Sequence, residues 1–273
     1  MIKRIYLEIT NACNLDCPFC TNSKGQSFMS LEEIDEYTSQ IKEICDYIYL
    51  HVLGEPTLHP HVNEILDILD KKDLKLQLVT NGTLLYKYPD ILKHKCLRKL
   101  SVSLHSINNL DIEEKYYETI NKLIEENTDC AIEIRFYDYD NLELKLKNYL
   151  NTLQSKYSFD LTSKQRSYRL KDKVYIYFEN FFKWPDMSDE YVGNKGRCQG
   201  IKSQIAILHN GDVTSCCLDP YGVNAFGNLK KECLKDILNN EKYLNALNDL
   251  RNNKLNLPLC QKCTYHLRFD RND

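Results

Sequence analysis

The sequence predicts an α/β fold, a partial (β/α)6 TIM-like barrel followed by a small α+β domain. Three observations predict it. Six short apolar runs alternate with segments of helical periodicity over about the first 180 residues. Alternation of this kind favours parallel strands joined by right-handed crossovers, and six units are too few to close an eight-stranded barrel. The composition then changes, and a hairpin signal with a second group of cysteines follows.

The elements of the barrel follow one another in a regular order. The predicted strands lie at 5–9, 47–53, 74–79, 99–104, 131–136 and 174–178. The segments with helical spacing between them lie near 30–44, 61–71, 84–93, 111–126 and 142–154. Ser30 is expected to cap the first helix, because acidic residues follow it in the first turn.

A second domain is expected after the sixth strand, which divides the chain into residues 1–183 and 184–273. A glycine-bearing stretch at 192–196 has the composition of a linker. The turn His209-Asn-Gly-Asp212 joins the runs 204–208 and 213–217, and an Asn-Gly turn between apolar runs predicts a β-hairpin. Helical spacing returns at 234–238 and 243–250.

Composition and charge exclude several classes of protein. The 273 residues carry a net charge of −3, which gives no electrostatic field for holding a nucleic acid. The N-terminus has no signal-peptide pattern, and no apolar run is long enough to span a bilayer. We therefore expect a cytoplasmic monomer with neither membrane nor nucleic-acid partners. Twelve cysteines in a reducing compartment favour metal ligation over disulfides.

Three of these cysteines follow the first predicted strand. Cys13, Cys17 and Cys20 are three and then two residues apart, so one loop can turn all three thiolates toward a single inorganic centre. A structural zinc site or an electron-carrying cluster has four protein ligands. Three ligands leave one coordination position open, which predicts that a substrate or cofactor occupies it.

This loop, Cys13-x3-Cys17-x2-Cys20 with Phe19 before the last cysteine, resembles the cluster loop of the radical S-adenosylmethionine (SAM) enzymes. The resemblance implies a [4Fe–4S] cluster whose fourth iron is chelated by SAM, and a 5′-deoxyadenosyl radical that takes a hydrogen atom from a substrate. It also implies a partial barrel and a contact between Phe19 and adenine. From the cysteines alone, a redox or zinc loop is the alternative.

Polar residues at three predicted strand ends extend the resemblance. Gly54-Glu55-Pro56 resembles the Gly-Gly-Glu segment of the family, which implies that Gly54 and Glu55 face the amino group of SAM. An ordinary turn is the alternative for this segment.

Later strand ends carry hydroxyl and amide side chains. Thr80, Asn81 and Ser103 are placed to bind the ribose hydroxyls of SAM. His105 stands where many members of the family have an aspartate.

The fifth predicted strand carries two charged residues. Glu133 and Arg135 are two apart and therefore lie on the same side of the sheet. Arg135 is a candidate for binding the SAM carboxylate through two hydrogen bonds, and both residues are candidates for catalysis by proton transfer. A structural Glu–Arg pair, or a polar face turned to water, is the alternative.

Four further cysteines belong to the second domain. Cys198, Cys216, Cys260 and Cys263 resemble the ligands of the Twitch domain, a shortened relative of the SPASM domain. This implies one auxiliary [4Fe–4S] cluster with four cysteine ligands, which would carry electrons or hold structure. Cys217 is an alternative to Cys216, and a zinc ribbon is the alternative to the cluster.

Together these resemblances imply a radical SAM oxidoreductase. A closed auxiliary cluster suits the removal of a second electron, so dehydrogenation of a small-molecule alcohol is favoured. The layout is similar to that of the 2-deoxy-scyllo-inosamine dehydrogenases. A peptide maturase that cross-links or epimerises its substrate is the alternative, and a non-catalytic iron–sulfur or zinc protein is the alternative of another class. Flavodoxin or ferredoxin is the expected electron donor.

Overall fold

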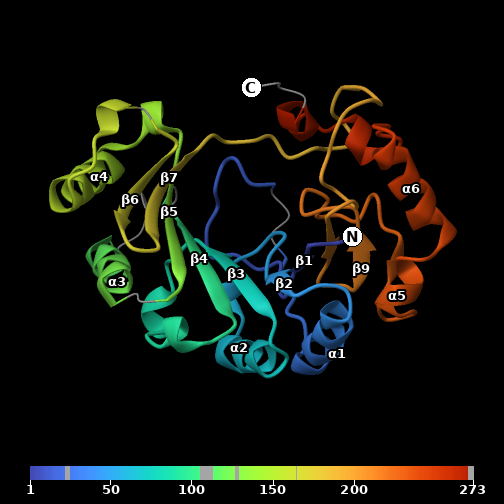
Figure 1. Ribbon diagram of the computed structural model, residues 1–273, viewed down its shortest axis with the longest axis horizontal. Coiled ribbons are helices and arrows are strands. Elements are labelled where there is room, and N and C mark those ends of the chain that lie inside the picture. The colour runs from blue at the N-terminus through green and yellow to red at the C-terminus, as the bar shows by residue number, and fades with distance from the viewer. Residues whose placement is uncertain (22–24, 105–112, 127–128, 164, 270–273) are drawn as a thin grey trace. The chain divides into compact units, whose positions relative to one another are not determined.

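The computed structural model describes the chain except residues 22–24, 105–112, 127–128, 164 and 270–273, so His105 lies outside the described residues. The chain forms two compact units. The first unit combines Met1–Lys75 with Phe182–Asp273, and the second is Leu76–Phe181. Each unit contains both strands and helices (Figure 1).

The first unit is built around a five-stranded part of the sheet, in the order β10-β9-β8-β1-β2. Its strands are β1 (Arg4–Leu7), β2 (Tyr47–Tyr49), β8 (Gln204–Ile207), β9 (Asp212–Thr214) and β10 (Gly227–Asn228). β1 is parallel to both β2 and β8, and β8 and β9 form the predicted antiparallel hairpin. A strand from the last third of the sequence therefore lies directly beside the first strand.

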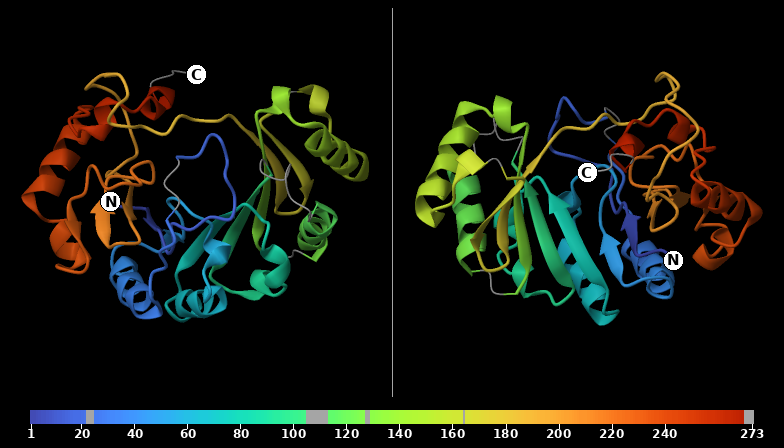
Figure 2. Two further views of the ribbon diagram at one scale, coloured as in Figure 1. Left: turned by 180° about the vertical axis from the view of Figure 1, so that it is seen from behind. Right: turned by 45° about the horizontal axis from the view of Figure 1, so that its top comes forward.

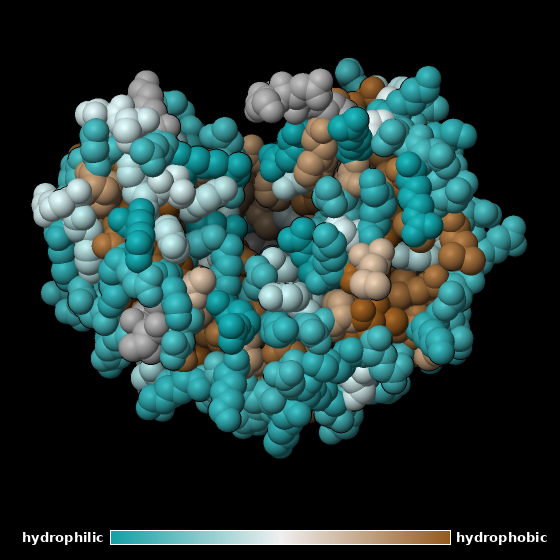
Figure 3. Space-filling view, in the orientation of Figure 1, coloured by the Kyte–Doolittle hydropathy of each residue, from teal (hydrophilic) through white to brown (hydrophobic). Residues whose placement is uncertain are grey.

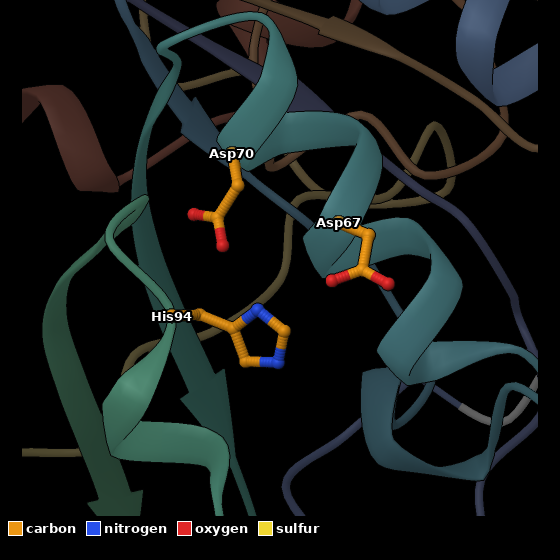
Figure 4. A group of neighbouring side chains, drawn as sticks. All are labelled: Asp67, Asp70 and His94. Carbon is orange, nitrogen blue, oxygen red and sulfur yellow. The ribbon is translucent and has the colours of Figure 1, made fainter.

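Four helices cover the strands of the first unit. They are α1 (Leu31–Lys42), α2 (Val62–Lys71), α5 (Leu234–Ile237) and α6 (Glu241–Arg251). α1 begins at the predicted cap, since the Ser30 hydroxyl accepts a hydrogen bond from the Glu33 amide at 3.2 Å and the Glu33 carboxylate accepts one from the Ser30 amide at 3.0 Å. α2 turns Asp67 and Asp70 to the same side, as their spacing of three residues requires (Figure 4).

The second unit has the strand order β3-β4-β5-β7-β6. Its strands are β3 (Lys75–Thr80), β4 (Leu97–Ser103), β5 (Ala131–Tyr137), β6 (Ser167–Lys171) and β7 (Val174–Glu179). The strands from β3 to β5 and on to β7 are parallel, and β6 returns antiparallel to β7. The helices α3 (Glu113–Glu126) and α4 (Leu144–Tyr157) lie on one face of these strands (Figure 2).

Burial alternates along the strands as a half-covered sheet requires. In β5 the apolar residues Ile132, Ile134 and Phe136 are fully buried, whereas Glu133 and Arg135 between them are partly exposed. The prediction that these two charged residues share one face is thus confirmed. The surface seen in Figure 3 is mostly hydrophilic.

The α/β class and the incomplete barrel of parallel strands are confirmed, because the strand order is open at both ends. The helix predicted at 84–93 was wrong. This stretch contains two short 3-10 helices, Leu85–Lys87 and Ile91–Lys93, because Pro89 has no amide hydrogen and disfavours a helical conformation of Tyr88 before it. The sequence reading also missed β6 and the two-residue strand β10.

Among the described residues, no helix combines the length and the hydropathy needed to cross a membrane.

Candidate functional site

The loop that carries Cys13, Cys17 and Cys20 is closed at its base by hydrogen bonds. The Thr10 hydroxyl donates to the Ser27 carbonyl at 2.8 Å and accepts from the Ala12 amide at 3.0 Å. Within the loop, the Cys20 amide donates to the Cys17 carbonyl at 3.0 Å, which makes a tight turn through Phe19. All three cysteines are partly buried. The three thiols are therefore held on one closed loop at the carboxyl end of β1.

Gly54 packs against the base of this loop. Its φ is +74°, and a Cβ atom added to it would lie 2.3 Å from the Thr10 carbonyl oxygen. The next amide, that of Glu55, donates to the Ala12 carbonyl at 2.8 Å. The Glu55 carboxylate is only 2 % exposed and accepts hydrogen bonds from the Thr57 amide and hydroxyl at 3.0 and 2.6 Å. The segment thus lies beside the cysteine loop. The Glu55 side chain stabilises the turn that leads to Thr57.

Replacing Gly54 by alanine should destabilise the protein strongly. The added methyl group would clash with backbone atoms and would hold a left-handed conformation, so we expect the free energy of unfolding to fall by at least about 2 kcal/mol. Anaerobic urea unfolding measures this. Gly222→Ala is the matched control, because Gly222 has a similar φ of +66° but its nearest neighbour atom lies 3.4 Å away. Equal losses in the two variants would show that close packing on the cysteine loop is unimportant.

A buried carboxylate, missed by the sequence analysis, connects three segments at this end of the first unit. Glu8 is 1 % exposed, and its Oε1 accepts from the Leu53 amide at 2.9 Å. Its Oε2 accepts from the backbone amide of His209 at 3.2 Å and lies 2.7 Å from His209 Nδ1. The Nε2 atom of His209 is 3.1 Å from the side-chain nitrogen of Asn11, just before the cysteine loop. A glutamate inside the apolar run of the first strand was the signal in the sequence.

In the second unit, Thr80 is the last residue of β3 and Asn81 follows it, and the two residues begin a turn. The Thr80 hydroxyl accepts from the Gly82 amide at 2.9 Å, and Asn81 Oδ1 accepts from the amide and hydroxyl of Thr83 at 2.9 and 2.7 Å. The Asn81 carbonyl accepts from the Tyr116 hydroxyl at 2.8 Å. Both side chains therefore stabilise the turn through hydrogen bonds. Their contact with ribose stays a prediction.

Arg135 and Glu133 do not pair with each other in the way that the structural alternative required. Glu133 forms an ion pair with Lys99 at 2.5 Å and accepts from the Ser101 hydroxyl at 3.1 Å. Arg135 donates to the Ser103 hydroxyl at 3.2 Å, and its Nε atom is buried with no hydrogen-bond partner among the described residues. A guanidinium with an unmet buried donor, and with no ion pair among the residues that the structure describes, is suited to bind an anionic group.

The cysteines of the second predicted set come together in the first unit. Cys198, Cys216, Cys260 and Cys263 are free thiols that lie after or near the β8–β9 hairpin and at the C-terminal end. Burial raises the pKa of each thiol, and Cys198 adds a further rise at the other three. A strongly positive centre among these partly buried thiols would favour their ionisation to thiolates.

Cys217 has a separate environment. Burial raises its pKa to about 11, and the Tyr6 hydroxyl donates a hydrogen bond to its sulfur. Tyr6 stacks on Tyr49 with ring centroids 4.5 Å apart. Cys233 is exposed, with its sulfur 3.0 Å from a carboxylate oxygen of Asp236. Cys216 interacts with Cys217, Cys260 and Cys198, each of which opposes its ionisation, and Cys198 also opposes the ionisation of Cys217.

An open α/β barrel with a three-cysteine loop after its first strand, and a second cysteine set gathered behind a hairpin, defines a class of iron–sulfur enzymes. Two family models match the chain: the radical SAM superfamily over residues 7–138 and the SPASM iron–sulfur cluster-binding domain over residues 198–264. The chain thus contains a radical SAM domain and an iron–sulfur cluster-binding domain of the SPASM type.

Relatives of known sequence resemble only part of the chain. A probable GTP 3′,8-cyclase from Methanococcus maripaludis is 33 % identical over 112 residues, which is 39 % of this chain and 38 % of that protein. The match thus spans well under half of that relative's length.

Solved structures resemble nearly the whole chain in fold. BtrN in complex with AdoMet and 2-DOIA has a TM-score of 0.60 and 16 % identity, covering 97 % of this chain and 93 % of that one. SuiB of Streptococcus suis bound to its precursor peptide SuiA has a TM-score of 0.61 and 16 % identity, covering 100 % and 74 %.

Proposed function

We propose that the protein is a radical SAM oxidoreductase that dehydrogenates a small-molecule alcohol. The observation that carries the proposal is the presence of two separate cysteine sets in the first unit, one of three and one of four residues. When bound, the cluster and SAM would supply a 5′-deoxyadenosyl radical that takes a hydrogen atom from the carbinol carbon. Completing the oxidation to a carbonyl then requires one proton and one electron to leave the substrate, and the second set provides for an electron acceptor.

The residues present suit these cofactors. Cys13, Cys17 and Cys20 would hold the cluster that binds SAM, since their loop is closed and Gly54 brings the next strand's end against its base. Gly54 and Glu55 would face the amino group of SAM, and Phe19 would face its adenine ring. Ligands from one tight loop leave the fourth coordination position to the cofactor.

Cys198, Cys216, Cys260 and Cys263 would hold the auxiliary cluster. Cys216 is the better ligand candidate than Cys217, because Cys216 interacts with both Cys260 and Cys198, whereas Cys217 packs against the apolar side chains of Tyr6, Val52, Ala206 and Leu208. A zinc ribbon is the alternative to this cluster, because a tetrahedral site of four thiolates also holds zinc.

We also propose residues 1–183 as the barrel domain and 184–273 as the auxiliary domain, with the two family matches falling inside these limits. An electron donor such as flavodoxin or ferredoxin would reduce the first cluster.

Arg135 is the proposed partner of the SAM carboxylate, and Thr80, Asn81 and Ser103 are the proposed partners of its ribose.

Arg135→Gln should raise the dissociation constant for SAM by roughly 10- to 100-fold, because a hydrogen bond to a charged group contributes about 1.5–3 kcal/mol. Anaerobic equilibrium dialysis measures it. Arg169→Gln is the control, since Arg169 is exposed on β6 and pairs with Asp172 at 2.7 Å. An unchanged affinity in Arg135→Gln would remove this role.

The proposed function has a direct test. Anaerobically purified protein should contain about eight irons and eight sulfides per chain, as two [4Fe–4S] clusters require. Reduction in the presence of SAM should release 5′-deoxyadenosine, and an alcohol deuterated at its carbinol carbon should transfer deuterium to it. Protein that binds no SAM would instead be a non-catalytic iron–sulfur or zinc protein.

A peptide maturase is the second candidate. The fold likeness to SuiB, which was solved with a precursor peptide, covers the whole of this chain and favours it. Deuterium transfer from a labelled peptide, with none from small alcohols, would replace the first candidate by this one.

A further inference from the structure

A buried asparagine links the two segments that carry ligands of the proposed auxiliary cluster. Asn224 is 1 % exposed, and its Nδ2 lies 3.7 Å from the Cys260 sulfur and 3.2 Å from the Ser215 hydroxyl. Its Oδ1 accepts from the Leu259 amide at 3.3 Å. Ser215 precedes Cys216 and Leu259 precedes Cys260, so one amide group contacts the chain beside both cysteines.

Asp219 holds this asparagine in place. Asp219 is fully buried. Its carboxylate accepts hydrogen bonds from the backbone amide of Asn224 at 2.8 Å, from the backbone amide of Val223 at 2.9 Å and from the Thr214 hydroxyl. Its own amide donates to the Cys216 carbonyl at 3.1 Å. The loop between Asp219 and Asn224 is therefore tied to the hairpin end, and the Asn224 side chain has little freedom to turn away from Cys260.

We propose that Asn224 is a positioning residue that raises the reduction potential of the auxiliary cluster through an N–H···S hydrogen bond to Cys260. Accepting an electron makes the cluster more negative, and a hydrogen bond to a ligand sulfur stabilises that form. The bond thus makes the cluster a better acceptor for the substrate's electron. The Gly200 amide makes a similar contact to Cys198 at 3.4 Å, but it is a backbone donor. This inference rests on the proposed auxiliary cluster.

The test is a redox titration of the two-cluster protein, followed by electron paramagnetic resonance. Asn224→Leu keeps the approximate volume and removes the donor, so the midpoint potential of the auxiliary cluster should fall while that of the SAM-binding cluster stays constant. Release of 5′-deoxyadenosine should persist, and product formation should slow.

Asn240→Leu is the matched control. Asn240 caps α6 by accepting from the Tyr243 amide at 2.9 Å and donates to the Phe226 carbonyl at 3.0 Å, with no cysteine contact. The Asn240→Leu variant should lower the stability of the protein, because it removes a helix cap. The midpoint potentials of both clusters should stay unchanged. An auxiliary potential that is the same in Asn224→Leu and wild type overturns the inference and leaves the proposed function standing. A wild type with only the first cluster overturns both.

A second measurement needs no variant. In wild-type protein labelled with ¹⁵N-asparagine, the reduced auxiliary cluster should show a hyperfine coupling to an asparagine nitrogen in pulsed electron paramagnetic resonance. The absence of this coupling would also overturn the inference.

Discussion

Replacing Cys17 by alanine should abolish the reductive cleavage of SAM. The variant leaves two thiolates on the loop, and a cluster site with a missing ligand no longer presents the iron that SAM would chelate. Loss of a partner outside the ligand set already costs 10- to 100-fold in metal affinity, so loss of a ligand should reduce 5′-deoxyadenosine release by more than roughly 100-fold. Chromatographic measurement of 5′-deoxyadenosine after anaerobic reduction checks this.

Cys45→Ala is the control for the first prediction. Cys45 belongs to the same unit and donates to the Tyr47 carbonyl at 3.5 Å, but it belongs to neither cysteine set. Cleavage in this variant should match wild type. If Cys17→Ala still cleaved SAM at the wild-type rate, the assignment of the first cluster would be wrong.

Replacing Cys260 by alanine should uncouple the cleavage of SAM from the formation of the oxidised product. SAM cleavage depends on the first set, so 5′-deoxyadenosine should still form. The oxidised product should fall at least roughly tenfold, because the electron left on the substrate has lost its acceptor. Product and 5′-deoxyadenosine measured in the same reaction give the ratio that decides the prediction.

Cys233→Ala is the matched control in the same region. Cys233 is exposed beside Asp236 and belongs to neither cysteine set. It should keep the wild-type ratio of product to 5′-deoxyadenosine. A Cys260→Ala protein that also keeps this ratio would show that the second centre is structural and does not accept electrons.

The charged strand β5 shows how far local sequence reasoning reaches. A period of two predicted that Glu133 and Arg135 share one face, and their matching exposure confirms it. The sequence did not reveal that Glu133 contacts Lys99 and Ser101 of β4, or that Arg135 contacts Ser103. That depends on the register of β4 against β5, in which Ser101 lies opposite Glu133 and Ser103 opposite Arg135. Register is set by packing between strands that are distant in sequence.

Very short strands and loop segments were predicted less accurately than the longer elements. The Asn-Gly turn predicted the β8–β9 hairpin correctly, because its conformation is local. β10 has two residues and acquires its extended form by pairing with β9, and no propensity over two residues could indicate it. The stretch 192–196 was predicted as a linker, yet the amide of Val192 donates to the Gln261 carbonyl at 2.8 Å and holds it against the C-terminal segment.

The spacing of the cysteines, the alternation of strands and helices, and the turn of the hairpin can all be recognised without coordinates. Each is a pattern within a few residues or a regular repeat along the chain. The contacts between polar groups cannot be recognised in this way, such as those of Glu8 with His209, 201 residues apart, and of Asn224 with Cys260. These contacts arise because β8 pairs with β1 and the loop from Asp219 to Asn224 folds back toward Cys260, and long-range packing of this kind leaves no spacing in the sequence from which to infer it.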